Sequence, residues 1–240
     1  MLEAFGWGAL GAAALLIGAL VAYLLFPSRR VIAVVMALGT GLLIGSVSYE
    51  LVEEALKHQA VFWVAVMVLV GAATFTVGDW LLERGGGGDR KDPTGAQTEG
   101  SPMAIVLGSV LDGIPESFVL GLTVLQGGVS VSLLAGVVLS NLPEGMSSSS
   151  GLKAAGWPQG RVVLMWSAVV LVSAVAAAAG YALLDPASGR IGALVQAFAG
   201  GALLAMLADT LLPEAYAVEG VLTGPLVVTG FAVSLALSAV

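Results

Sequence analysis

Two carboxylates and a proline stand together in a stretch of this chain that otherwise suits hydrocarbon. In the segment LDGIPES, Asp112 and Glu116 lie four residues apart around Pro115, and no other charged residue occurs from 103 to 125. Residues four apart share one face of a helix. A proline inside a helix also leaves the carbonyl four residues earlier without its amide donor. The segment therefore presents several oxygen atoms that could bind a cation.

A related segment follows 28 residues later. GVVLSNLPEGMSSS repeats the pattern of GSVLDGIPESFVLG, so that Pro143 and Glu144 take the places of the first proline and glutamate. Ser140 lies four residues before Glu144, and Asn141 is next to it. Each Pro-Glu pair falls near the middle of its apolar stretch. We expect the two stretches to be helices that pack together, with Glu116 and Glu144 facing each other.

Carboxylates inside an apolar layer must be protonated, paired with a base or bound to a cation. No lysine or arginine occurs at this depth in the predicted spans. A divalent metal ion or protons remain as the partners of these acids. The residues of the predicted central site are Asp112, Glu116, Ser140, Asn141 and Glu144.

The composition is that of a membrane protein. Hydrophobic residues make up 58% of the chain and charged residues 10%, whereas soluble domains carry about 25% charge. The mean hydropathy is +0.99. The chain has no cysteine, which excludes disulfides and thiolate metal sites. Its net charge of -7 argues against a nucleic-acid partner. The hydrophobic composition makes the lipid bilayer the expected surrounding.

Apolar stretches of roughly 20 residues predict membrane-spanning helices. The fold class is therefore all-α and polytopic, with eight transmembrane helices expected at about 5–26, 31–52, 60–82, 103–125, 129–152, 162–184, 191–213 and 221–240. We interpret residues 1–240 as a single transmembrane transporter domain. The Gly-rich, charged segment 83–101 is interpreted as a flexible linker between spans three and four.

The basic residues predict the orientation, because loops on the cytoplasmic side are enriched in lysine and arginine. With both termini outside, the cytoplasmic loops hold Arg29, Arg30, Arg84, Arg90, Lys91, Lys153 and Arg161. Only Lys57 and Arg190 remain on the outer side. We therefore expect a multi-pass protein of the cell membrane, plasma or inner, with the linker in the cytoplasm.

Spans two and seven resemble each other after a shift of 160 residues, which aligns 37–55 with 197–215. Because these spans run in opposite directions, the match predicts an inverted repeat of spans one to three and six to eight around spans four and five. Such repeats often enclose a binding site at the membrane midplane. Glu50 and Asp209 are the deepest acids in the clusters near the ends of spans two and seven. We expect them to bind metal on the outer and inner access paths.

The segments DGIPES and SNLPEG resemble the paired motifs in spans four and five of the ZIP (Zrt/Irt-like) metal transporters. That resemblance implies eight spans, outer termini, a cytoplasmic third loop and uptake of a divalent transition metal through a site shared by spans four and five. The family's fourth-span histidine is Asp112 here, and the asparagine after it is Gly113. A site with oxygen ligands alone suits harder metal ions than a site that includes imidazole. Zinc, manganese and iron therefore all remain candidate substrates.

Two alternatives come from other functional classes. One is a proton-linked carrier of a small organic substrate, with Glu116 and Glu144 as proton relays. The other is a metal-binding membrane sensor that moves no ion. We expect no enzymatic activity and no organic cofactor, since the predicted spans contain no histidine at depth and no Ser-Lys pair. The sequence leaves the oligomeric state open, a homodimer included.

Overall fold

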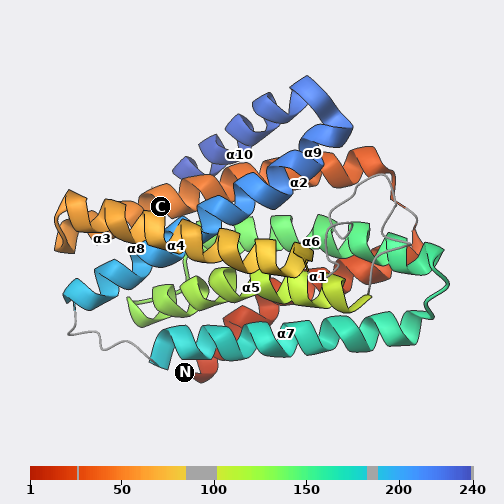
Figure 1. The fold of residues 1–240 in the computed structure, drawn as a ribbon, viewed down its shortest axis with the longest axis horizontal. Coiled ribbons are helices and arrows are strands. Elements are labelled where there is room, and N and C mark those ends of the chain that lie inside the picture. The colour runs from red at the N-terminus through yellow and green to blue at the C-terminus, as the bar shows by residue number, and fades with distance from the viewer. Residues whose placement is uncertain (26, 85–101, 183–188, 239–240) are drawn as a thin grey trace.

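A computed structural model describes residues 1–25, 27–84, 102–182 and 189–238, and within these ranges every regular element is a helix. The helices lie along one long axis (Figure 1). They are α1 (Leu2–Leu24), α2 (Arg29–Ser46), α3 (Glu53–His58), α4 (Val61–Leu82), α5 (Pro102–Leu125), α6 (Val131–Ala154), α7 (Gln159–Ala182), α8 (Gly189–Met206), α9 (Leu212–Glu219) and α10 (Thr223–Ser238). Three short segments join them, namely η1 (Val47–Val52), η5 (Leu207–Leu211) and η6 (Gly220–Leu222). The expectation of an all-helical protein is confirmed.

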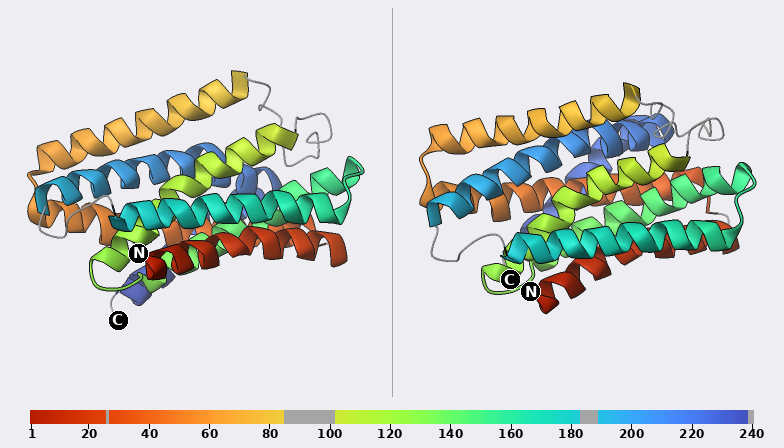
Figure 2. Two further views of the ribbon diagram at one scale, coloured as in Figure 1. Left: turned by 90° about the horizontal axis from the view of Figure 1, so that it is seen from below. Right: turned by 60° about the horizontal axis from the view of Figure 1, so that its bottom comes forward.

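The start of α1 and the end of α10 lie at the same end of the bundle (Figures 1 and 2). We call this the termini end. The turn from α3 to α4 and the loop from α5 to α6 are also there. At the opposite end, Arg30 at the start of α2 binds Glu219 at the end of α9, with 3.0 Å between Nε and Oε1. This ion pair fixes α9 to the start of α2.

Helical stretches long and apolar enough to cross a membrane number six within the described residues. They are Leu2–Leu24, Arg29–His58, Val61–Leu82, Ile105–Leu125, Gln159–Ala182 and Gly189–Ser238. The last contains 50 residues and turns back at Gly220, whose φ of 58° lies in the left-handed region that glycine tolerates. The helix α6, rich in serine, is not among the six. The chain is thus compatible with a multi-pass membrane protein.

The start of α6 is defined by turn and cap residues. Gly127 and Gly128 have φ values of 129° and 157° and end the run of α5. Ser130 then caps α6, because its hydroxyl accepts a hydrogen bond of 2.9 Å from the Leu133 amide. Pro115 and Pro143 lie inside α5 and α6, and both helices continue through them.

The helix pairs pack in two groups. In one, α1 packs on α6 and α7, and α7 packs on α5. In the other, α4 packs on α8, and α10 packs on α2. Extensive contact between the groups runs through α2 and α6. The core at this junction includes Leu43, Leu133 and Val137, all fully or almost fully buried.

Glycines allow the closest helix approaches. A Cβ on Gly41 of α2 would overlap the Val227 carbonyl of α10, and one on Gly201 of α8 would overlap the Val68 carbonyl of α4. The same two interfaces carry the return contacts, Gly230 on Leu38 and Gly71 on Phe198. Gly41 and Gly201 are the residues that the 160-residue shift aligns. Small residues at such interfaces are typical of membrane helices.

The helical stretches that begin with α2 and α8 also share a local irregularity. The helix widens into a π-helical turn at Val47–Val52 and again at Leu207–Leu211. The 160-residue shift brings the two starting residues into register. Such π-helical turns are uncommon and often occur at functional sites. Each contains one of the acids predicted for the access paths, Glu50 in η1 and Asp209 in η5.

The predicted linker 83–101 is described only at its start, where Glu83 and Arg84 continue from α4. The Arg84 guanidinium lies 3.9 Å from the centroid of the Trp80 ring. The rest of the linker lies outside the described residues.

Candidate functional site

The central site is built where α5 and α6 cross. These helices share few backbone contacts, because α5 packs chiefly on α7 and α6 chiefly on α1 and α2. Polar side chains connect them instead. Ser140 of α6 donates a hydrogen bond of 3.2 Å to Glu116 Oε1 of α5. Ser140 also donates to the Val137 carbonyl of its own helix, at 3.0 Å.

A second hydrogen bond joins the same two helices, with its donor on α5 and its acceptor on α6. Ser109 of α5 donates to Glu144 Oε1 of α6 over 2.6 Å. The antiparallel course of the helices accounts for this exchange, because a residue earlier on α5 lies opposite one later on α6. The sequence argument did not single out Ser109. The spacing could nevertheless have indicated it, because Ser109 lies three residues before Asp112 and seven before Glu116, on the same helix face.

The three central acids lie close enough to interact electrostatically. Glu116 experiences Coulombic interactions from both Glu144 and Asp112. Only 2% of Glu116 is exposed, and its Oε2 is buried with no hydrogen-bond partner among the described residues. Asp112 and Glu144 are partly exposed. Three acids interacting in so little water favour a cation or a proton as their partner.

Asn141 joins this site to α1. Its side-chain amide donates a hydrogen bond of 3.3 Å to the Gly11 carbonyl, and Asn141 is buried. On the neighbouring side of α6, Gly39 of α2 approaches the Leu139 carbonyl, which Pro143 deprives of its usual donor. The structure thus brings the five predicted central residues to the α5–α6 crossing, between α1 and α2.

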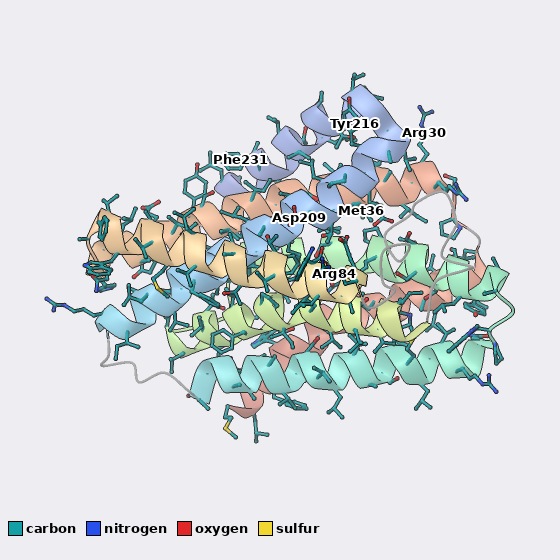
Figure 3. The ribbon with its side chains drawn as sticks, in the orientation of Figure 1. Arg30, Met36, Arg84, Asp209, Tyr216 and Phe231 are labelled. Atoms are coloured by element: carbon teal, nitrogen blue, oxygen red, sulfur yellow. The ribbon has the colours of Figure 1, made fainter. Side chains whose placement is uncertain are left out.

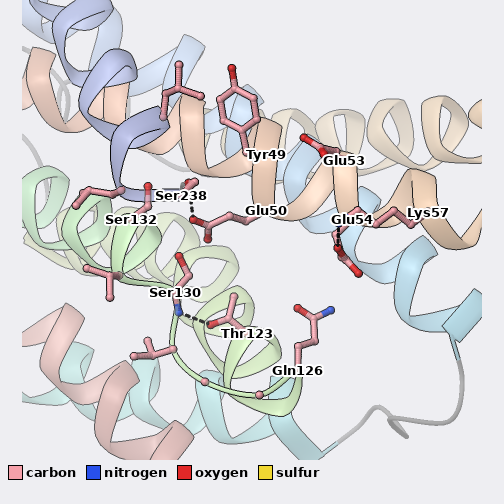
Figure 4. A pocket seen from close by; sticks show the side chains of 16 residues that line it. Tyr49, Glu50, Glu53, Glu54, Lys57, Thr123, Gln126, Ser130, Ser132 and Ser238 are labelled. Atoms are coloured by element: carbon pink, nitrogen blue, oxygen red, sulfur yellow. Dashed lines mark hydrogen bonds and ion pairs between the residues drawn. The ribbon is translucent and has the colours of Figure 1, made fainter. Parts of the chain in front are cut away.

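A cavity of about 780 Å³ opens at the termini end (Figure 4). Its wall includes Glu50, Glu53 and Glu54 from the end of span two, and Thr123 and Ser132 from α5 and α6. Glu50 Oε1 accepts a hydrogen bond of 3.0 Å from Ser238 of α10. Glu50 therefore lies in the cavity wall, in contact with the end of α10.

A layer of apolar side chains lies between this cavity and the central acids. On each of three helices, the chain passes from a cavity residue through buried apolar residues towards the α5–α6 crossing. The cavity residues are Glu50 of η1, Thr123 of α5 and Ser132 of α6. The buried residues between are Leu43 of α2, Val47 of η1, Val119 and Leu120 of α5, and Leu133 and Val137 of α6. They separate the cavity from Glu116.

The structure does not bring Asp209 to the central residues. Asp209 is exposed on η5 beside α4, where Thr76 donates to its Oδ2 at 3.5 Å (Figure 3). Glu214 on α9 takes the position next to α6. Ser147, three residues after Glu144, donates a hydrogen bond of 2.7 Å to Glu214 Oε1. Of these two acids, Glu214 is therefore the one bonded to α6.

The described side chains do not form a ready-made metal cage. Within these ranges, no group of three or more His, Asp or Glu residues is placed to hold one metal ion. The serine hydroxyls bind carboxylate oxygens that such an ion would use. A metal ion bound here would need carboxylates supplemented by serine and asparagine oxygens.

No family model matches the chain, and no curated protein matches it either. The fold and composition define an all-helical protein whose apolar helices are compatible with several passages through a membrane. What such a protein does must be argued from its site.

Proposed function

We propose that this chain is a transporter of divalent transition-metal ions, similar to the ZIP family, which moves them into the cytoplasm. The observation that carries the proposal is the α5–α6 crossing. There Asp112, Glu116 and Glu144 gather with serine and asparagine oxygens, and Glu116 is almost fully buried. A carboxylate buried in an apolar layer with other acids near it attracts a cation. The metal ion is the substrate, and no resident cofactor is invoked.

The proposal includes eight transmembrane helices arranged as an inverted repeat. Two observations support the repeat beyond the sequence match. The π-helical turns of spans two and seven coincide under the 160-residue shift. The helix pairs also correspond under the repeat. The contact of α1 with α6 matches that of α7 with α5, and the contact of α2 with α10 matches that of α8 with α4. Glycines make close contacts in the other two interfaces as well. Gly18 of α1 meets Leu142 and Gly145 of α6 meets Leu15, while Gly180 of α7 meets Phe118 and Gly121 of α5 meets Ala177.

The proposed orientation places the termini end outside the cell membrane. At the opposite end, the helix termini carry Arg29, Arg30, Lys153 and Arg161, and the charge rule assigns that end to the cytoplasm. The cavity lined by Glu50 then faces the exterior. It would collect hydrated cations, because Glu50, Glu53 and Glu54 outnumber Lys57 in its wall.

In this proposal, the layer containing Leu43, Leu133 and Val137 closes the path on the outside. On the inner side, Ser147 and Glu214 continue the line of polar groups from Glu144. This arrangement suits alternating access, in which a site opens to one side at a time. Motion that parts the apolar layer would admit an ion from the cavity to Glu116.

Metal choice follows from the ligand atoms. With Asp112 in place of an imidazole, the central site offers oxygen only, which suits manganese or iron better than a histidine site does. Zinc remains a candidate substrate, because carboxylates also bind it.

The test is uptake of Mn²⁺, Fe²⁺ and Zn²⁺ into vesicles containing the purified protein, compared with the Glu144→Gln variant. Uptake by the wild type alone supports the proposal. Binding without uptake would favour the membrane sensor. Absence of both binding and uptake, with proton movement driven by an organic solute, would favour the proton-linked carrier.

A further inference from the structure

The two central glutamates are held by two serines that come from opposite helices. Glu116 on α5 is bonded by Ser140 on α6, and Glu144 on α6 is bonded by Ser109 on α5. Ser140 belongs to the predicted metal site. Ser109 was not among the residues predicted for that site.

The contact of Ser109 has the geometry of a strong hydrogen bond. Its length of 2.6 Å is in the range of hydroxyl donors bound to charged carboxylates. Ser109 is 5% exposed, so water does not compete effectively for its hydroxyl. Among the described residues, Glu144 is the hydrogen-bond partner of the Ser109 side chain.

The position of Ser109 also allows it to control the orientation of Glu144. Its hydroxyl engages Oε1 of Glu144 and so fixes the rotation of that carboxylate. The orientation in which Glu144 meets a metal ion between α5 and α6 would then depend on this bond. Groups that orient a metal-binding side chain typically change metal affinity by about 10- to 100-fold when removed.

We infer that Ser109 is a positioning residue of the central site, which acts on the metal ion through Glu144. The inference rests on the proposed function. It predicts that the hydroxyl matters because of its bond to one carboxylate, and that any replacement keeping this bond keeps the affinity.

The experiment measures equilibrium binding of Mn²⁺ and of Zn²⁺ to the full chain in lipid nanodiscs. Ser109→Ala should weaken binding by about 10- to 100-fold, and Ser109→Thr, which keeps the hydroxyl, should bind nearly as the wild type does. Ser150→Ala is the matched control, because Ser150 lies on the helix of Glu144 and, among the described residues, bonds the Met146 carbonyl, at 2.7 Å. Equal binding by Ser109→Ala and wild type, or equal losses in Ser109→Ala and Ser150→Ala, would overturn the inference.

A double-mutant cycle separates positioning from general damage. In Glu144→Asp the carboxylate is one methylene shorter and loses contact with Ser109, so adding Ser109→Ala should change the remaining affinity little. Additive losses would show that Ser109 acts independently of Glu144 and would reject the assignment.

A further measurement does not require a bound metal. The infrared difference between the metal-free wild type and Glu144→Gln identifies the carboxyl band of Glu144, and Ser109→Ala should shift that band. If the wild type binds neither ion, the proposed function fails, and the band still decides whether Ser109 holds Glu144. An unshifted band means that it does not.

Discussion

Ser140 of α6 and Glu116 of α5 are joined by a buried hydrogen bond of 3.2 Å, although their helices pack mainly on other partners. The link between the two central helices is therefore polar and local. Because it is confined to the crossing, changes in its carboxylates should alter metal binding more than they alter the fold.

Removal of either glutamate should abolish tight metal binding. Glu116→Gln and Glu144→Gln keep side-chain volume and remove one ligand charge, so affinity for Mn²⁺ should fall by at least about 100-fold, more than the loss of an orienting group costs. Calorimetric titration of the purified variants measures this. Glu3→Gln, at the exposed start of α1, serves as the control. Retained affinity in both central variants would remove the α5–α6 crossing from consideration.

Asp112 should set the preference between metals. The change Asp112→His replaces a carboxylate by an imidazole, which zinc accepts more readily than manganese does. We expect the ratio of zinc to manganese affinity to rise, as measured by competition between the two ions. An unchanged ratio would mean that Asp112 does not contact the ion.

Access to the central site should depend on Glu50 and Glu214. Glu50→Ala and Glu214→Ala should each slow Mn²⁺ uptake several-fold while equilibrium affinity at the central site changes little, because neither residue lies among the central acids. Asp209 was also predicted from the sequence to lie on the inner path. Its exposure beside Thr76 leads us to expect a smaller loss in Asp209→Ala. A larger loss there would restore Asp209 to the path in place of Glu214.

The membrane orientation can be tested by cysteine labelling, since the chain has no cysteine of its own. A cysteine at Gln126, exposed in the loop after α5, should react with a membrane-impermeant reagent added to intact cells. A cysteine at Gly87 in the linker should react only after the membrane is opened. The reverse pattern would invert the proposed topology.

The glycine contacts predict a difference in stability within a single helix. Gly201→Ala should lower the free energy of unfolding by about 1–3 kcal/mol, because the added methyl overlaps the Val68 carbonyl. Gly192→Ala in the same helix meets no atom within 4 Å and should be neutral or slightly stabilising. Thermal unfolding in detergent measures both. Equal stabilities would show that α4 and α8 can separate at little cost.

The sequence by itself determined the helical, apolar character of the chain and the positions of the two Pro-Glu segments. These properties are local, because the length of an apolar run predicts a membrane helix and the spacing of Asp112 and Glu116 places both on one face. The same spacing predicted that Ser140 accompanies Glu144. The 160-residue match aligned the segments in which η1 and η5 occur, although it predicted neither turn.

Only the tertiary structure decided which polar groups meet. Ser109 and Glu144 are 35 residues apart, and Ser147 and Glu214 are 67 apart. Their contacts depend on where helices cross and how each is rotated about its axis. A helix end carries acids on several faces, so sequence position could not distinguish Glu214, which lies against α6, from Asp209, which is exposed. That distinction is fixed by packing, which no short-range pattern in the sequence contains.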